Sequence, residues 1–262
     1  MLTSDEIKQS APSSWAKLIG HASDPYERKA RLYPALLTLV PVLGIGLSLY
    51  GLSRDVAQSF VAIATALGGA YLLVNVGRER GKRIENRLFE QWGGAPTTQL
   101  QRHRDARVDP ITKQARHVFL SQKLGIPAPT AAVEISDPLA ADHFYAASSR
   151  WLLEHTRDRQ RFPLLFQENV SYGYRRNALG LKPMGICICL VSIVWVLSTQ
   201  GFLTSHGLEA AALLHMTRGA QLSIAISLVM LAIWFVFFTR KTAETAAFAY
   251  ADMLLRACTI LE

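Results

Sequence analysis

The stretch QLSIAISLVMLAIWFVFFT, residues 221–239, decides how the rest of the chain is interpreted. It contains no Asp, Glu, Lys or Arg, and its length is close to the ~20 apolar residues that a helix needs to cross ~30 Å of hydrocarbon. Residues 32–52, 56–77 and 184–203 have the same two properties. A buried helix of a soluble protein can be this apolar once, but four such runs in a chain of 262 residues predict four membrane spans.

Basic residues cluster at one end of each run, and a single orientation places all four clusters on the same side of a membrane. The clusters are Arg28, Lys29 and Arg31; Arg78, Arg80, Lys82 and Arg83; Arg175, Arg176 and Lys182; and Arg240 and Lys241. Cytoplasmic ends of spans carry an excess of Lys and Arg, so both termini and the segment between spans two and three are expected in the cytoplasm. The predicted fold class is an all-α membrane protein with four transmembrane helices and a helical cytoplasmic block between spans two and three.

This reading divides the chain into five segments. They are an N-terminal cytoplasmic segment 1–31, a transmembrane hairpin 32–77, a helical cytoplasmic domain 78–182, a second transmembrane hairpin 183–240 and a cytoplasmic C-terminal helix 241–262. The first apolar run begins too late in the chain, and lacks the small-residue cleavage site, to be a signal peptide.

Local signals predict the helices of the cytoplasmic part. Span two is expected to continue until the GGAP sequence at 93–96 stops it. Asp109-Pro110 and Asp137-Pro138 each place an N-cap residue before a proline at the first helical position, which predicts helices over about 110–124 and 138–157.

Three weaker helical segments are also expected. One runs from Phe162 toward Leu179 and leads into span three through Lys182-Pro183. The C-terminal segment has apolar residues on roughly one face and is expected to dock on the middle block. Residues 4–22 are expected to form a short amphipathic helix at the membrane interface.

Signatures of catalysis are missing from the sequence. There is no phosphate-binding loop, nucleophile elbow, zinc signature or dinucleotide fingerprint, and the spans lack the ionisable residues typical of proton relays. We therefore expect no enzyme activity, no catalytic residues, no metal site and no cofactor. Four cytoplasmic histidines have no carboxylate at metal-binding spacing and are expected to be isolated surface or interfacial side chains: His103, His117, His143 and His155.

Two features within the spans raise the possibility of a pore. Span two carries small residues at four-residue steps, and such residues let helices approach closely, either within one four-helix unit or around a symmetry axis that lines a pore. Span four ends in WFVFF, residues 234–238, which is either an aromatic belt at the headgroup level or a hydrophobic gate that closes by dewetting. The candidate pore or gate residues are Ala62, Ala66, Gly69, Asn75, Trp234, Phe235 and Phe238.

The cytoplasmic block carries 18 Lys and Arg against 11 Asp and Glu, but many of these cations flank the spans, so charge alone does not indicate a nucleic-acid partner. Within it, residues 157–182 hold six cations against two acids, with aromatic residues interleaved. Arginine forms bidentate contacts with phosphate and aromatic rings stack on bases, which favours a nucleotide or oligonucleotide site. A basic collar or a helix on anionic lipid has the same composition. The candidate ligand-binding residues are Arg157, Arg159, Arg161, Asn169, Tyr172, Tyr174, Arg175 and Arg176.

The layout of two spans, a helical block and two more spans, together with RGKRIENRLFEQWGGAPTTQL at 80–100 and FPLLFQENVSYGYRRNALGLKP at 162–183, resembles a known group. It is similar to the four-transmembrane effectors of bacterial nucleotide-signalled antiphage systems, namely the SMODS-associated four-transmembrane group and the Hailong-type membrane effector. No residue-level site is carried over from that group.

The resemblance implies a homo-oligomeric ion channel in the bacterial inner membrane, with a tetramer favoured. It would respond to a nucleotide or oligonucleotide second messenger made by a partner nucleotidyltransferase, and would depolarise the membrane. The alternative is a non-conducting membrane scaffold whose basic cytoplasmic helices dock a soluble partner or anionic lipid.

Overall fold

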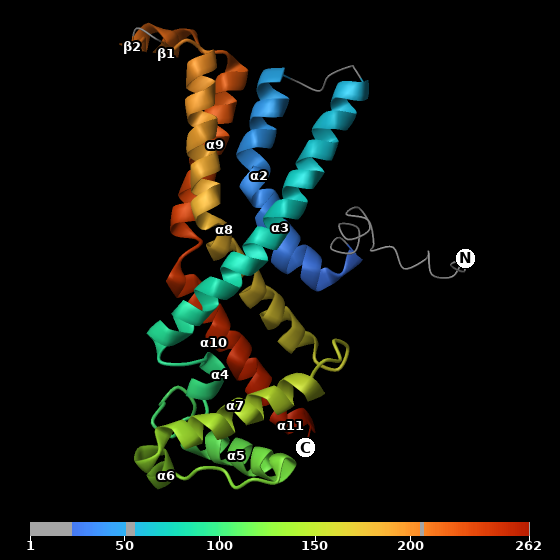
Figure 1. Cartoon of the computed structure of the whole chain (residues 1–262), viewed down its shortest axis with the longest axis vertical. Coiled ribbons are helices and arrows are strands. Elements are labelled where there is room, and N and C mark those ends of the chain that lie inside the picture. Colours follow the sequence, from blue (N-terminus) through green and yellow to red (C-terminus); the bar gives the residue numbers. More distant parts are fainter. Residues whose placement is uncertain (1–22, 51–55, 205–206, 262) are drawn as a thin grey trace, which may run out of the picture. The chain divides into compact units, whose positions relative to one another are not determined.

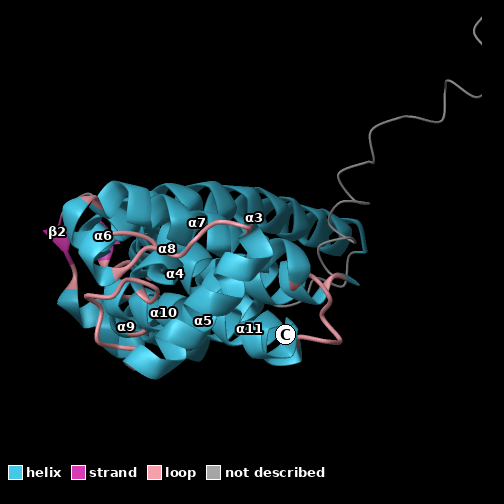
Figure 2. Cartoon of the chain, turned by 90° about the horizontal axis from the view of Figure 1, so that it is seen from below, coloured by secondary structure: helices cyan, strands magenta, loops and turns pink. Residues whose placement is uncertain are grey.

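The computed structural model describes residues 23–50, 56–204 and 207–261, and of residues 50, 56–63 and 204 it describes the backbone alone. Helices account for nearly all of these residues (Figure 2). The chain divides into two compact units. Unit 1 consists of Met1–Lys82 and Arg176–Thr239, and unit 2 consists of Arg83–Arg175 and Arg240–Glu262. The prediction of an all-α protein is confirmed.

Unit 1 contains most of the long apolar helices. Its elements are η2 (Glu27–Leu32), α2 (Tyr33–Ile45), η3 (Gly46–Tyr50), β1 (Leu203–Thr204), β2 (Gly207–Leu208), η4 (Ala210–His215), α9 (Arg218–Val236) and parts of α3 (Val56–Trp92) and α8 (Pro163–Thr199). Strands β1 and β2 form a two-residue antiparallel pair between α8 and α9.

Three helices among the described residues are long and apolar enough to cross a membrane: Glu27–Leu49, Pro163–Thr199 and Arg218–Val236. They contain the first, third and fourth apolar runs. The second run lies in α3, whose residues 56–63 belong to the part described by backbone alone. Large apolar side chains on these helices are exposed, including Val191, Trp195 and Val229. A soluble protein rarely leaves so continuous an apolar surface uncovered, which agrees with a membrane-embedded protein.

Buried hydroxyl groups of unit 1 find partners within the helices. Helix α2 packs against α9 (Figure 1). The hydroxyl of Ser48, in the following η3, lies 2.5 Å from that of Ser223 in α9. Thr38, Ser223 and Ser227 are buried, and each donates its hydroxyl proton to the carbonyl four residues earlier in its helix. Such pairing is required in hydrocarbon, where no water can satisfy a polar group.

One close backbone contact between helices in unit 1 is made by glycines. A Cβ added at Gly180 in α8 would lie 2.7 Å from the backbone nitrogen of Gly81 and 3.1 Å from the carbonyl oxygen of Gly77, both in α3. The two backbones therefore touch at this crossing, because neither helix has a side chain there. Asn177, one turn earlier in α8, is buried and donates its amide proton to the carbonyl of Ala30, 2.8 Å away.

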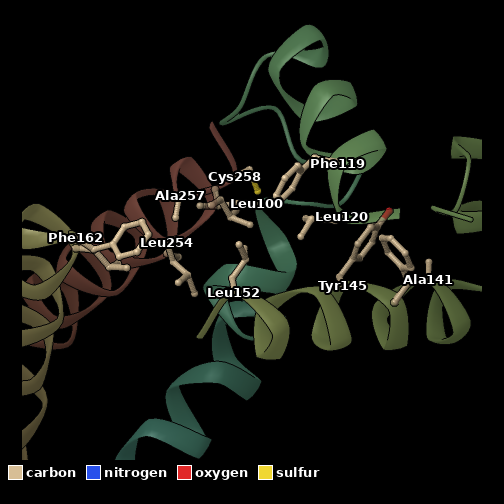
Figure 3. Packing of buried hydrophobic residues seen from close by; sticks show 14 residues of the cluster. Leu100, Phe119, Leu120, Ala141, Tyr145, Leu152, Phe162, Leu254, Ala257 and Cys258 are labelled. Atoms are coloured by element: carbon tan, nitrogen blue, oxygen red, sulfur yellow. The ribbon is translucent and has the colours of Figure 1, made fainter. Parts of the chain in front are cut away.

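Unit 2 packs its helices around one apolar core. Its helices are α4 (Pro96–Gln99), α5 (Pro110–Leu124), α6 (Ala131–Ser136), α7 (Pro138–His155), α10 (Arg240–Arg256) and α11 (Cys258–Leu261), with the remaining parts of α3 and α8. Figure 3 shows side chains from these helices converging, with Leu100 and Phe119 near Cys258, and Leu152 facing Leu254.

The predicted ends of two helices are confirmed. The Asp109 side chain accepts from the backbone of Thr112 at 2.8 Å to cap α5, and Gly125 ends that helix with a left-handed φ of 67°. Asp137 caps α7 in the same way, although α7 ends at His155 rather than at residue 157. Helix α3 ends at Trp92, directly before the two positive-φ glycines of the GGAP sequence.

Other boundaries differ from the expectation. The helix expected to lead into span three through Lys182-Pro183 does so as α8, which ends at Thr199 rather than at residue 203. Helix α9 ends at Val236 and α10 begins at Arg240, so the C-terminal helix is separate from span four. Its predicted docking is confirmed, because Leu254, Leu255 and Cys258 belong to the core of unit 2. The amphipathic helix expected at residues 4–22 lies outside the described residues.

Candidate functional site

The arginines of the predicted ligand-binding stretch lie on the surface of unit 2. Arg157, Arg159 and Arg161 are exposed in the turn between α7 and α8. The guanidinium of Arg159 lies over the Phe166 ring, 4.7 Å from its centroid. Arg161 lies 5.5 Å from the centroid of Phe162 and donates to the carbonyl of Ile260 at 2.9 Å. These contacts tie two of the three arginines to neighbouring helices.

The other predicted ligand residues face different surroundings. Tyr172 is buried, donates its hydroxyl proton to the Glu85 carboxylate and stacks on Tyr250 with ring centroids 6.2 Å apart. Arg175 donates to the carbonyl of Thr242 at 3.4 Å. Arg176 belongs to unit 1, while the other candidates belong to unit 2. The remaining two, Asn169 and Tyr174, are half-buried on α8. None of the eight lines either cavity described below.

The candidate pore residues of span two are placed on α3. Ala62 lies outside the described side chains. Ala66 and Gly69 are half-buried, and a Cβ added at Gly69 would meet nothing within 4 Å. Asn75 is also half-buried and donates its amide proton to the carbonyl of Tyr71 at 3.0 Å. In the single chain, therefore, part of this small-residue face has no neighbour among the described residues.

The aromatic residues at the end of span four divide into two groups. Trp234 is fully buried with its ring against Gly185, and its ring centroid lies 4.9 Å from that of Phe238, which is also buried. Phe235 is 56% exposed, and the Lys182 ammonium lies 5.5 Å from its ring centroid. The first two rings pack inside unit 1, so only Phe235 and Phe237, which is 64% exposed, face outward among these described aromatic residues, as an aromatic belt requires.

A cavity that was not predicted lies in unit 2. It has a volume of about 700 Å³ and is lined by residues of α5, α10, α11 and the loop before α5. We call it the α5–α10 cavity. Three arginines line it, Arg107, Arg116 and Arg256, together with the carboxylates of Asp109 and Asp252.

Asp252 holds two of the arginines in place. It accepts from the Arg116 guanidinium at 3.2 Å and from Arg256 at 2.8 Å. Arg116 is only 7% exposed, and its Nη1 has no hydrogen-bond partner among the described residues. The guanidinium of Arg107, which also lines the cavity, lies 4.0 Å from the centroid of Phe248. Charged donors and an aromatic face therefore line the same space.

No family model, curated protein or solved structure matches the chain. The chemistry of the described residues is therefore the basis for assigning a function.

Unit 2 also contains a buried polar cluster. His117 is 2% exposed, and its ring stacks on Tyr145 with centroids 5.5 Å apart and meets His103 edge-on at 5.0 Å. The Tyr145 hydroxyl donates to the Glu134 carboxylate at 2.8 Å, and the backbone of His103 donates to the same carboxylate at 2.7 Å. The prediction of isolated histidines was wrong for His103 and His117.

Charge in this cluster is controlled by burial and hydrogen bonds. Burial disfavours ionisation of Glu134, but hydrogen bonds from His103, Tyr145 and Arg104 outweigh it and lower the pKa of the carboxyl. Burial, and then the charge of nearby His103, lower the pKa of His117 to about 4. The ring of His117 is therefore neutral at pH 7.

The cluster shares a second cavity of about 470 Å³, lined by His103, His117 and the segment before α6. Within the described part of the chain, no group of three or more His, Cys, Asp or Glu could hold a metal ion. Every polar partner named here is a residue of the same unit, so the cluster is suited to holding α5, α6 and α7 together.

Proposed function

We propose that the chain is a four-span protein of the bacterial inner membrane that forms a homo-oligomeric ion pore, with a tetramer favoured. Both termini and most of unit 2 would lie in the cytoplasm. A nucleotide or oligonucleotide signal, made by a nucleotidyltransferase partner, would change the pore between closed and open states. Opening would depolarise the membrane and act as an antiphage defence.

The observation that carries the proposal is the continuity of two helices. Helices α3 and α8 are each 37 residues long, and each contributes residues to both units. A ligand bound to unit 2 would therefore act on helices that also form the apolar unit. A ligand can shift such a balance only by binding one state more tightly than the other, and about 5.5 kcal/mol of difference is needed to reverse a 1:99 population.

In an oligomer, a neighbouring subunit would cover the open face of α3. Gly68 and Gly69 have open space where a Cβ would lie, and Leu72 is exposed on the same helix. In a membrane, small residues mark faces where a neighbouring helix packs closely. We therefore assign the Ala62, Ala66 and Gly69 face to contacts between subunits around the pore.

Reconstitution in liposomes tests the pore directly. Purified protein should release trapped ions only when the product of a partner nucleotidyltransferase is present. Absence of a ligand-dependent ion flux with every nucleotide tested would refute the proposal.

The expected topology is tested by placing a single cysteine at Gln122, which is exposed on α5, in a background without Cys187, Cys189 and Cys258. This cysteine should react with an impermeant thiol reagent only after the inner membrane is opened.

A non-conducting scaffold is the second candidate function, and one observation favours it. Trp234 and Phe238 pack inside unit 1 rather than standing free to narrow a pore. In this case the exposed basic turn at Arg157, Arg159 and Arg161 would bind an acidic partner or anionic lipid. Capture of such a partner by a reconstituted protein that conducts no ions would support the scaffold over the pore.

A further inference from the structure

The α5–α10 cavity is lined by an arginine that has a hydrogen-bond donor available for an anion. Buried polar groups in folded proteins almost always have a hydrogen-bond partner. Arg116 departs from this rule, because its Nη2 is bound to Asp252 while its buried Nη1 has no partner among the described residues. A guanidinium offers its donors as a planar fork that matches the oxygens of a phosphate or carboxylate.

The charges that line the cavity leave a net positive balance. Three guanidinium groups face two carboxylates. Asp252 is occupied by Arg116 and Arg256, and Asp109 is occupied by the backbone N–H of Thr112 at the start of α5. Arg107 is held by the Asp105 carboxylate at 3.3 Å and still presents its guanidinium over Phe248. An entering anion would therefore have three guanidinium groups, those of Arg107, Arg116 and Arg256, among the residues that line the cavity.

Most of the remaining lining residues are apolar, which limits the kind of molecule that fits. Leu100, Val108, Phe119 and Phe248 contribute to the walls. Figure 3 shows Leu100 and Phe119 close together at the edge of the core. The volume of about 700 Å³ lies within the range of sites for small organic molecules. An inorganic anion alone would leave most of this space and its apolar surface uncovered.

We propose that the α5–α10 cavity binds a small organic phosphate, with its phosphate held by Arg107, Arg116 and Arg256 and its apolar body against Phe119 and Phe248. This places a binding site far along the chain from the basic stretch at 157–176. The binding of this molecule does not depend on the proposed function. The further inference that the same molecule is the gating signal rests on the proposed function.

Binding to the full-length protein in detergent provides the test. The probes are AMP and ATP, with inorganic phosphate and adenosine as partial ligands, each measured by isothermal titration calorimetry. At least one organic phosphate should bind saturably, and more tightly than inorganic phosphate or adenosine. Arg107→Gln and Arg256→Gln should each weaken it by at least about tenfold, the usual effect of losing a charge-assisted hydrogen bond.

Arg107 and Arg256 are chosen because their side chains are 50% and 63% exposed, respectively. Replacing them should therefore affect folding less than replacing buried Arg116 would. Arg157→Gln is the matched control, since it removes an exposed arginine of unit 2 outside the cavity. Unchanged thermal unfolding of all three variants verifies their folding.

Three results would overturn the inference. They are no binding of any organic phosphate in the panel, equal binding of inorganic phosphate, or binding that Arg157→Gln abolishes while Arg107→Gln does not. Failure of the pore is a separate result: phosphate binding without ion flux would refute the proposed function and leave this site in place. Ligand-dependent flux that Arg107→Gln leaves unchanged would support the pore and show that the molecule bound in this cavity is not the gating signal.

Discussion

Replacing Gly180 with alanine tests the close crossing of α3 and α8. The added Cβ would lie 2.7 Å from the nitrogen of Gly81, about 0.7 Å short of the 3.4 Å at which ordinary contact begins. Every atom that it meets is backbone, namely Gly81, Arg80 and Gly77, so no side chain can turn aside to relieve the clash. The helices must therefore separate.

The size of the effect follows from two opposing terms. Overpacking costs about 1–3 kcal/mol, and a clash with rigid backbone belongs at the upper end of this range. Alanine in place of glycine in a helix recovers about 1 kcal/mol. The net loss is about 2 kcal/mol, and for a chain of this size it lowers the midpoint of thermal unfolding by about 4–8 °C.

Thermal unfolding in detergent, followed by intrinsic tryptophan fluorescence, measures this shift. Gly46→Ala is the matched control, because it makes the same exchange in helical segment η3 of unit 1, at a position with nothing within 4 Å of the new Cβ. The control should unfold at the same temperature as the wild type or slightly higher. If Gly180→Ala were as stable as Gly46→Ala, the close backbone contact would not exist.

Three further perturbations test unit 2. Leu254→Ala removes a fully buried side chain from the core and should cost about 2–5 kcal/mol, seen as a lower unfolding temperature, whereas truncating exposed Leu139 should have little effect. The pKa of His117 is about 4 in the folded protein and about 6.5 in the unfolded chain, so its contribution to stability is complete above pH 6.5 and is lost as the pH falls toward 4, by up to about 3 kcal/mol. His117→Gln should reduce this dependence of the unfolding free energy on pH. An unchanged dependence would assign it to another group. Asp142→Asn weakens the two-bond pairing with Arg102, at 2.9 and 2.7 Å, and should cost about 1–3 kcal/mol; unfolding in urea measures it, and no change in midpoint would show that the pair is only a surface contact.

Local signals predicted helix ends well because the residues that end a helix act on their own neighbours. Asp109 and Asp137 cap the next turn of backbone, and Gly125 adopts a left-handed conformation that other residues rarely take. Pro183 was taken as a boundary, but it lies inside α8. Prolines are tolerated in apolar helices where neighbouring helices support the freed backbone, and no local pattern reports such support.

The candidate site was predicted less well because it depends on contacts between distant parts of the chain. A linear search for basic residues favours 157–176, where arginines are adjacent in sequence. The α5–α10 cavity instead combines Arg107 and Arg116 with Arg256, which come from segments far apart in the sequence. The pairing of His103 with His117 and Glu134 is likewise invisible without the fold. One clue was present: Arg256 and Asp252 are one helical turn apart.

The division of unit 2 between two chain segments has a consequence for synthesis. Residues 83–175 leave the ribosome before α9 is made, but Leu254 and Leu255 complete their core only after residues 240–262 have followed. Domains generally fold as units once their chain is complete. Phe248, Asp252 and Arg256 arrive in that last segment, so a nascent subunit has no finished α5–α10 cavity while its apolar helices are being inserted. A chain that terminates early after α9 would thus lack the cavity in which we propose that an organic phosphate binds.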